Sequence, residues 1–197
     1  GDSRIIAGIH SAMDVIGGRL QSIAADVANL NAMTVEQRKE AYLQAQTQLM
    51  KETSSSTFES FYSLAKTPYD ANDRFADLEK LKQQVSHWMT YGFNQIGDKT
   101  KIATVPKGAE VLLETRLPYL TADQRRVVLK STALASGYPV MDDVEGYGRL
   151  NLFRAGAGYG SFDGDVNLAM DANLGGFNQY DQWSNDITGA GKLTKSG

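Results

Sequence analysis

The sequence predicts a mainly α-helical chain that ends in a small glycine-rich β segment. Apolar residues recur at steps of three and four through several stretches of the chain, which is the period of an amphipathic helix. Beyond Gly146 glycines become frequent, charged residues thin out, and apolar side chains alternate over residues 166–170 with the period of a strand. We therefore expect helices through about residue 157 and short strands, joined by Gly, Asn and Asp turns, over residues 162–197.

Residues 1–31 carry the first helical stripe. Its apolar members are Ile5, Ile6, Ile9, Met13, Ile16, Leu20, Ile23, Val27 and Leu30. Gly17 and Gly18 interrupt the series, and glycine is unfavourable inside a helix. The pattern therefore predicts two helical pieces, or one helix with a break, close to residues 12–18.

A second helix is expected to begin at Thr34. Gln37 follows three residues later, and this spacing has the form of a capping box, in which each side chain bonds the other residue's backbone N–H. The stretch from there to Met50 is polar and rich in Ala and Gln, which is typical of a solvent-facing helix. Residues 51–57, with three consecutive serines, predict a loop.

A third helix is expected after Asn72 or Asp73, either of which has the short polar side chain of an N-cap. One face of this helix is apolar and consists of Phe75, Leu78, Leu81, Val85 and Trp88. Polar and charged residues fill most of the remaining positions, so the pattern predicts an amphipathic helix over residues 73–91.

Two shorter helices and a last strand complete the prediction. An apolar segment over residues 109–117 stops before Pro118, which disfavours helix in the residue preceding it. Thr121 and Gln124 repeat the capping-box spacing and predict a helix to about Ala135. Residues 192–194 are the candidate last strand.

Composition excludes several classes of protein. The chain has 197 residues, 42% of them hydrophobic and 22% charged, so gross disorder is not expected. A formal net charge of −3 gives no electrostatic basis for non-specific nucleic-acid binding. No apolar run approaches the roughly 18 residues of a membrane-spanning helix. The absence of cysteine excludes disulfides and thiolate metal sites.

Four residues near the start of the chain carry the candidate chemistry. Asp14 lies four positions after His10, so on a helical or near-helical backbone their side chains share a face. A carboxylate there accepts the Nδ1 proton of the imidazole, which leaves the Nε2 lone pair free to attack. Arg4 offers a planar cationic fork for phosphate oxygens, and Ser3 a further donor at a helix start.

Arg4 and His10 do not align on a regular helix. Six positions separate them, an offset of about 120° at roughly 100° per residue. Their convergence on one anion therefore needs a bend or the full reach of the arginine. We expect Gly8 to remove side-chain bulk where the two side chains must pass.

The spacing SRxxxxxHxxxD resembles the third signature block of the type 2 phosphatidic acid phosphatase superfamily, which includes bacterial acid phosphatases and vanadium-dependent haloperoxidases. All four defining positions match. The resemblance implies that His10 is the nucleophile that forms a phosphohistidine, or the vanadate ligand of a haloperoxidase. It further implies that Asp14 orients the imidazole, that Arg4 binds phosphoryl oxygens, that Ser3 supports the phosphate or the loop, and that no metal is needed.

The chain departs from this family in two earlier blocks. KxxxxxxRP supplies the Lys and Arg that hold phosphate, and PSGH supplies the histidine that protonates the leaving group. Lys107 and Arg116 have the wrong spacing and order for the first block, and Tyr138 replaces the histidine of the second. We therefore expect this chain to be the C-terminal part of a larger enzyme, with the upstream core as its partner, and to be nearly or wholly inactive by itself.

Two other patterns in the sequence have simpler structural explanations. His87 lies beside Trp88 without a neighbouring carboxylate in the sequence, so we assign it no function. Oxygen-bearing residues alternate over 163–171 as in a calcium loop, but Leu168 and Leu174 stand where such a loop requires glycine and glutamate. A surface strand is preferred there, and no metal is expected.

These observations predict three parts: residues 1–31 as the end of the phosphatase core, 32–160 as a helical extension, and 161–197 as a β segment. The segment from Gly146 onward also resembles, more loosely, bacterial proteins in which this core precedes autotransporter-type β repeats. We expect an exported phosphatase, periplasmic or at the outer membrane, acting on a phosphate ester. The alternatives are a vanadium-dependent haloperoxidase, a connector to a β array without chemistry of its own, and a His10–Asp14 pair that serves stability alone.

Overall fold

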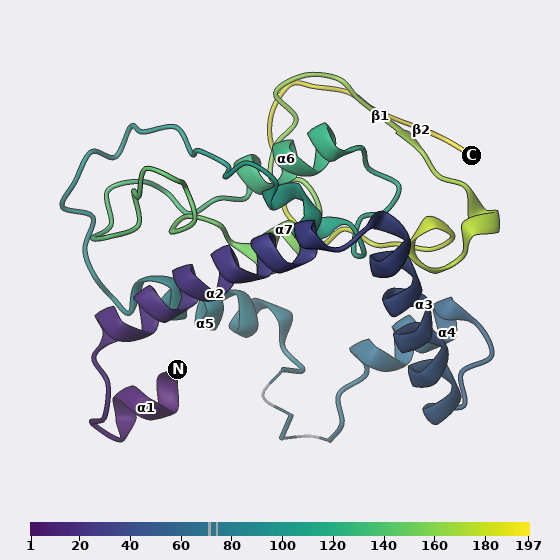
Figure 1. The fold of residues 1–197 in the computed structure, drawn as a ribbon, viewed down its shortest axis with the longest axis horizontal. Helices are drawn as coiled ribbons and strands as arrows, with labels where there is room; N and C mark the ends of the chain where they lie inside the picture. The colour runs from purple at the N-terminus through teal and green to yellow at the C-terminus, as the bar shows by residue number, and fades with distance from the viewer. Residues whose placement is uncertain (71, 74) are drawn as a thin grey trace.

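The computed structural model describes residues 1–70, 72–73 and 75–197, and in these the chain is mainly helical and ends in a short two-stranded sheet (Figure 1). The helices are α1 (Asp2–Ile6), α2 (Ala12–Ala32), α3 (Val35–Glu52), α4 (Phe58–Lys66), α5 (Leu78–Thr90), α6 (Ala122–Ser131) and α7 (Leu152–Gly156). Short 3₁₀ turns form η1 (Ala109–Leu113), η2 (Ala172–Leu174) and η3 (Gly176–Asn178), and the strands are β1 (Val166–Ala169) and β2 (Leu193–Ser196). The predicted fold class, mainly α with a small β segment, is confirmed.

The break in the first helical stripe lies at residues 7–11, before the predicted interval. Gly8 has φ of +69°, a left-handed conformation that ends α1, and Ser11 caps the start of α2. Gly17 and Gly18 lie inside α2, where both are exposed and an added Cβ would meet nothing within 4 Å. Their lack of a side chain thus weakens this helix without breaking it.

The capping boxes correctly predict the starts of two helices. Thr34 with Gln37 and Thr121 with Gln124 form the reciprocal bonds that begin α3 and α6. A further capping box, Thr57 with Ser60, begins α4, which was not predicted. Its third residue is serine instead of glutamate or glutamine, so the usual signature is absent.

The predicted cap of α5 is wrong. Asp77 is the N-cap, and its carboxylate accepts from the backbone N–H groups of the second and third helical residues at 3.1 and 3.0 Å. The carboxylate of Asp73 instead accepts from the N–H groups of Tyr69 and Phe75 in a preceding turn. Because those bonds fix a turn at Asp73, the helix begins at Leu78.

Two of the shorter elements end earlier than expected. The apolar segment after Gly108 forms only the 3₁₀ turn η1 and leaves regular structure well before Pro118. Helix α6 ends at Ser131, because Thr132 adopts the cap and donates its hydroxyl to the Val128 carbonyl at 2.7 Å. The chain turns at Gly137 only later, with φ of +94°.

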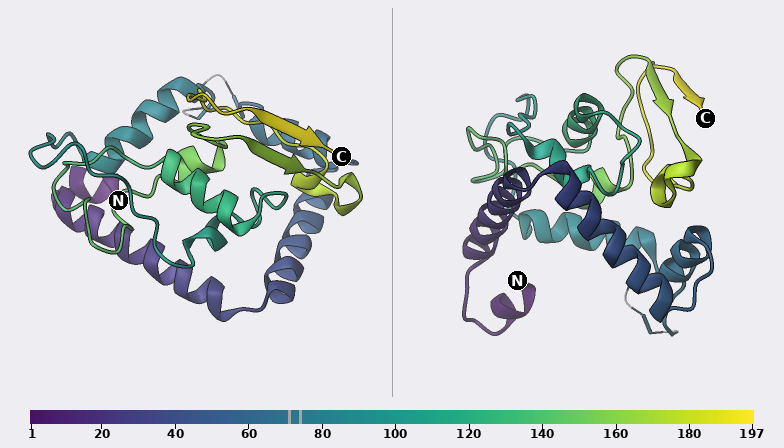
Figure 2. Two further views of the ribbon diagram at one scale, coloured as in Figure 1. Left: turned by 90° about the horizontal axis from the view of Figure 1, so that it is seen from above. Right: turned by 45° about the vertical axis from the view of Figure 1, so that its right-hand side comes forward.

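The core lies where η1 packs against the C-terminal half of α2 and α6 packs against η1 and α7. Figure 2 shows α6 between α2 and the β segment. The core residues are Ile23, Val27, Ala109, Leu113, Leu117, Leu120, Val128, Leu129, Leu150, Ala155, Tyr159, Phe162 and Leu168. Apolar side chains from all three predicted parts therefore meet in one cluster, and their removal from water is its main stabilisation.

The two strands pair in parallel, with Val166 opposite Leu193. An isolated parallel bridge joins Ser161 to Thr188 at the same sequence offset, and the Asp165 carboxylate accepts from the Lys192 N–H at 2.9 Å. The last strand covers residues 193–196, close to the predicted 192–194.

Val128 and Val127 provide a matched test of the core. Both lie on α6, but Val128 is fully buried and Val127 is 46% exposed. Val128→Ala is expected to lower the free energy of unfolding by about 2 kcal/mol through lost burial and the cavity left behind. Val127→Ala gains the same helix propensity without a cavity and should change stability by less than about 0.5 kcal/mol in urea unfolding. Equal losses in the two variants would contradict the described packing.

Candidate active site

The structure brings three of the four predicted site residues together at the junction of α1 and α2. The Arg4 guanidinium Nη1 lies 3.3 Å from His10 Nε2. On the other side of the ring, Nδ1 lies 3.8 Å from the Asp14 carboxylate. The imidazole thus stands between a permanent cation and an anion, as the sequence pattern predicts.

A bend in the backbone achieves this convergence. The N–H groups of Ile9 and His10 both donate to the Arg4 carbonyl, at 3.0 and 3.3 Å, so the chain folds back over the end of α1. Gly8 makes the fold possible by its positive φ. No neighbouring atom lies within 4 Å of a Cβ placed there, so the predicted reason for this glycine, removal of bulk, is wrong.

The contact between Arg4 and His10 fits one tautomer of the neutral imidazole. A guanidinium has only donors, so Nε2 must accept with its lone pair. The ring proton then sits on Nδ1 and faces Asp14. This is the tautomer that a nucleophilic Nε2 requires.

Asp14 acts on the imidazole by charge at this distance, because 3.8 Å exceeds a hydrogen bond. Its Oδ2 atom accepts from the Ser11 N–H at 3.0 Å, and the Asp14 N–H donates to the Ser11 hydroxyl at 3.2 Å. The backbone N–H of Ser11, and after it the Ser11 side chain, lower the pKa of Asp14, and His10 contributes less. The capping box of α2 therefore holds the carboxylate ionised beside the ring.

Ser3 is not part of this group. Its side chain lines a neighbouring hollow, and its carbonyl accepts from the Ala7 N–H at 3.0 Å within α1. Among the described residues, no hydrogen bond joins Ser3 to His10.

The three convergent residues line an open hollow of about 450 Å³. The side chains of His10 and Asp14 are 39% and 61% exposed, so a ligand can reach both from solvent. The same hollow is lined by Arg19, which the sequence analysis missed. It lies five positions after Asp14, an offset of about 140° at roughly 100° per residue, so no helical spacing indicated it.

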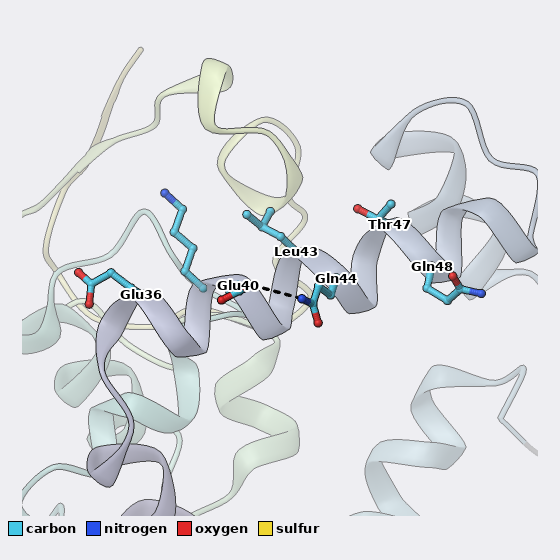
Figure 3. A pocket seen from close by; sticks show the side chains of 7 residues that line it. Glu36, Glu40, Leu43, Gln44, Thr47 and Gln48 are labelled. Atoms are coloured by element: carbon cyan, nitrogen blue, oxygen red, sulfur yellow. Dashed lines mark hydrogen bonds between the residues drawn. The ribbon is translucent and has the colours of Figure 1, made fainter.

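Another hollow, of about 800 Å³, lies along one face of α3. Figure 3 shows its side chains projecting from this single helix, with Gln44 bonded to Glu40 at 3.4 Å. It is lined by Glu36, Lys39, Glu40, Leu43, Gln44, Thr47 and Gln48. A solvated face with mixed charges and no convergent groups carries no chemistry.

The residues set aside in the sequence take structural roles. Arg116 forms an ion pair with Asp181 at 2.7 Å, and neither Arg116 nor Tyr138 lines the hollow at His10. The His87 ring packs edge-on against Tyr91. Within residues 1–70, 72–73 and 75–197, no three His, Asp or Glu side chains are placed to hold a metal, and no helix is long and apolar enough to cross a bilayer.

Comparison with known proteins gives partial relatives. An extracellular serine protease of Serratia marcescens is 30% identical over 121 residues, covering 46% of this chain and 12% of the relative. Serotype-specific antigen 1 of Mannheimia haemolytica is 35% identical over 86 residues, covering 44% of this chain and 8% of the antigen. The chain thus spans about a tenth of the length of these relatives. No protein-family profile and no solved structure matches.

Ser11→Ala is expected to raise the pKa of Asp14 toward its ordinary value, because it removes one of the two bonds that Ser11 makes. A lowered folded pKa stabilises the fold above the unfolded value, and this contribution is lost as pH falls through the folded value. The variant should therefore lose less stability on acidification than the parent. Carboxyl NMR titration measures the pKa, with Asp77, the cap of α5, as the internal reference that must stay unchanged.

Proposed function

We propose that this chain carries the nucleophile half of a phosphomonoester hydrolase. The arrangement of Arg4, His10 and Asp14 supports the proposal, and the contact of the guanidinium with Nε2 carries it. A tetrahedral oxyanion that enters between them would accept from the guanidinium and present phosphorus to the Nε2 lone pair. The same arrangement would hold vanadate, which makes vanadate a probe of the site.

In the proposed reaction, the Nε2 lone pair of His10 attacks phosphorus, and the P–N bond forms as the P–O bond to the leaving group breaks. Asp14 stabilises the positive charge that develops on the ring through Nδ1. The departing alkoxide takes a proton from a general acid. Water then attacks phosphorus, breaks the P–N bond and returns the lone pair to Nε2, releasing inorganic phosphate.

The general acid and the further phosphate-binding cations of this scheme are expected from another segment of the protein. An exposed apolar face beside the site supports this: Ile6 is 81%, Ile9 68% and Met13 39% exposed. Large aliphatic side chains clustered at such exposure are typical of a surface that another element covers. We propose that the upstream phosphatase core packs there.

The names of the partial relatives support export but not peptide hydrolysis. One relative is described as extracellular, and we propose that this protein is exported too. Neither histidine of the chain is hydrogen bonded to a serine among the residues described in the structure, so no Ser–His pair supports a peptidase. The similarity to the protease therefore supports only the proposal that this protein is exported.

A connector is the second candidate function, and the parallel pairing of β1 and β2 favours it. Parallel strands need a long crossover, and here the chain returns to the same register after 27 residues, as the pair Val166 and Leu193 shows. β2 is exposed along its whole length, so one edge is open to a further strand. A β array attached at this edge would leave the His10 site unchanged, so the two proposals are compatible.

Orthovanadate binding tests the anion site in this chain. The sequence has two histidines, so ¹⁵N NMR of the imidazoles gives an internal control. Vanadate is expected to shift the signals of His10 and leave those of His87 unchanged. Arg4→Met should weaken binding about tenfold, the typical loss for one charge-assisted bond. Equal shifts of both rings, or none at His10, would contradict the proposed site.

Hydrolysis tests the chemistry in a protein that carries this chain behind the blocks KxxxxxxRP and PSGH. His10→Ala should reduce turnover of 4-nitrophenyl phosphate by more than about 10³, as expected for a lost nucleophile. The matched control is His87→Ala, which should keep full activity. Full activity in His10→Ala would refute the catalytic role, and a haloperoxidase would instead oxidise halide with peroxide once vanadate is added.

A further inference from the structure

The contact between Arg4 and His10 determines what a ligand must bring to this site. The guanidinium Nη1 donates to Nε2 across 3.3 Å, and among the described residues the Arg4 side chain has no other hydrogen bond or ion pair. A guanidinium carries only donors, so Nε2 is the acceptor of this bond. The pair therefore offers a ligand donors on one side and a single acceptor on the other.

A fully deprotonated oxyanion matches only the donor side of this pair. Its oxygens accept from the guanidinium, but they also meet the lone pair of Nε2, and two acceptors have no proton to share. One added proton removes the mismatch. A proton on the oxyanion is donated to Nε2, and a proton on Nε2 is donated to the oxyanion, so the bound state has the same number of protons in either case.

The positive charges around His10 oppose protonation of the free ring. Arg4 faces Nε2 from α1 as a permanent cation. Arg19 lines the same hollow from α2, together with Gly1, which carries the amino group of this chain. The Arg19 Nη2 donates to the Gly148 carbonyl at 3.1 Å, and no carboxylate in the described ranges pairs with this guanidinium. An anion beside Nε2 offsets these charges, so binding of the anion and uptake of a proton favour each other.

Asp14 favours the proton from the other side of the ring. Its carboxylate lies 3.8 Å from Nδ1, and no other described carboxylate lines this hollow. The backbone N–H of Ser11 and then its side chain lower the pKa of Asp14, so the carboxylate stays ionised at neutral pH. The neighbouring hollow of about 580 Å³, which α1 and the end of α5 line, contains Asp2 but not His10. A proton taken up with an anion is therefore shared between His10 and that anion.

We propose that this site binds a tetrahedral oxyanion together with one proton, and so takes a phosphate monoester as its monoanion in preference to its dianion. The inference rests on the proposed phosphatase function and specifies the ionisation state of the substrate. Phosphate monoesters lose their second proton at about pH 6, so the two states coexist near neutrality. The monoanion brings an O–H group that donates to Nε2. For attack this O–H turns away, the lone pair forms the P–N bond as the P–O bond to the leaving group breaks, and the proton stays on the phosphoryl oxygen.

Isothermal titration calorimetry of this chain with sulfate and with inorganic phosphate counts the protons. Sulfate has the same tetrahedral shape but stays a dianion through the neutral range, so a proton taken up with it resides on the protein. Titrations at about pH 8, where a free imidazole is mostly neutral, are made in two buffers of different ionisation enthalpy. Uptake of about one proton per anion is expected for both ligands. Sulfate affinity should fall about tenfold per pH unit above neutrality, the slope of one linked proton.

¹⁵N NMR identifies the group that holds the proton in the sulfate complex. Saturation with sulfate should move the Nε2 signal of His10 to the position of a protonated ring nitrogen, while the His87 ring keeps its protonation state. Binding without proton uptake, or uptake without this change at His10, overturns the inference and leaves the anion site of the proposed function standing. No binding of sulfate, phosphate or vanadate at His10 overturns the proposed function itself.

His10→Gln is the matched variant, because a side-chain amide can donate to an oxyanion but does not titrate. Sulfate affinity should stay within about fivefold of the parent at neutral pH, the size of one neutral hydrogen bond, while proton uptake and the pH dependence of binding disappear. The His10 side chain is 39% exposed, so the core is untouched, and unchanged His87 signals report the fold. Proton uptake that persists in this variant overturns the inference, because another group would then hold the proton. If the variant does not bind sulfate, the pH dependence and the Nε2 signal of the parent decide.

Discussion

The candidate site depends on one constraint, the reversal of the chain between α1 and α2. Without it, Arg4 and His10 would point away from each other on a continuous helix. Gly8 provides the left-handed turn, and Ser11 restarts the helix with a capping box that also holds the Asp14 carboxylate. The same few hydrogen bonds therefore end one helix, begin the next and set both sides of the imidazole, so the site needs no long-range contact to form.

Helix α2 links this local arrangement to the core. Its first turn carries Asp14, while Ile23 and Val27 in its second half are buried against η1 and its neighbours. Between them Arg19 bonds the carbonyl of Gly148, in a loop whose backbone N–H groups converge on the Asp143 carboxylate. The three N–H groups that donate to the Asp143 carboxylate fix the conformation of this loop. The Gly148 carbonyl that accepts from Arg19 is therefore held in place.

The sequence was informative where a local rule determines structure and less so where tertiary packing does. Capping-box spacing located the starts of α3 and α6, and the His10–Asp14 spacing placed those residues together because neighbours in sequence need only a turn. The break at residues 7–11 was misplaced because two adjacent glycines are a stronger pattern than the single Gly8. Arg19 and the wall from α5 lie far apart in sequence, and no local pattern connects them.

Long-range polar contacts join the chain between β1 and β2 to the helical core. Asp181 pairs with Arg116 and accepts the hydroxyl of Tyr119, to which the Trp183 indole donates. The Trp183 ring packs on Tyr159 in the core, and the Arg116 guanidinium lies over the Phe177 ring. Because burial keeps Tyr119 protonated, this donor is retained across neutral pH. The segment that leads to β2 is therefore fastened both to the residues between η1 and α6 and to the core.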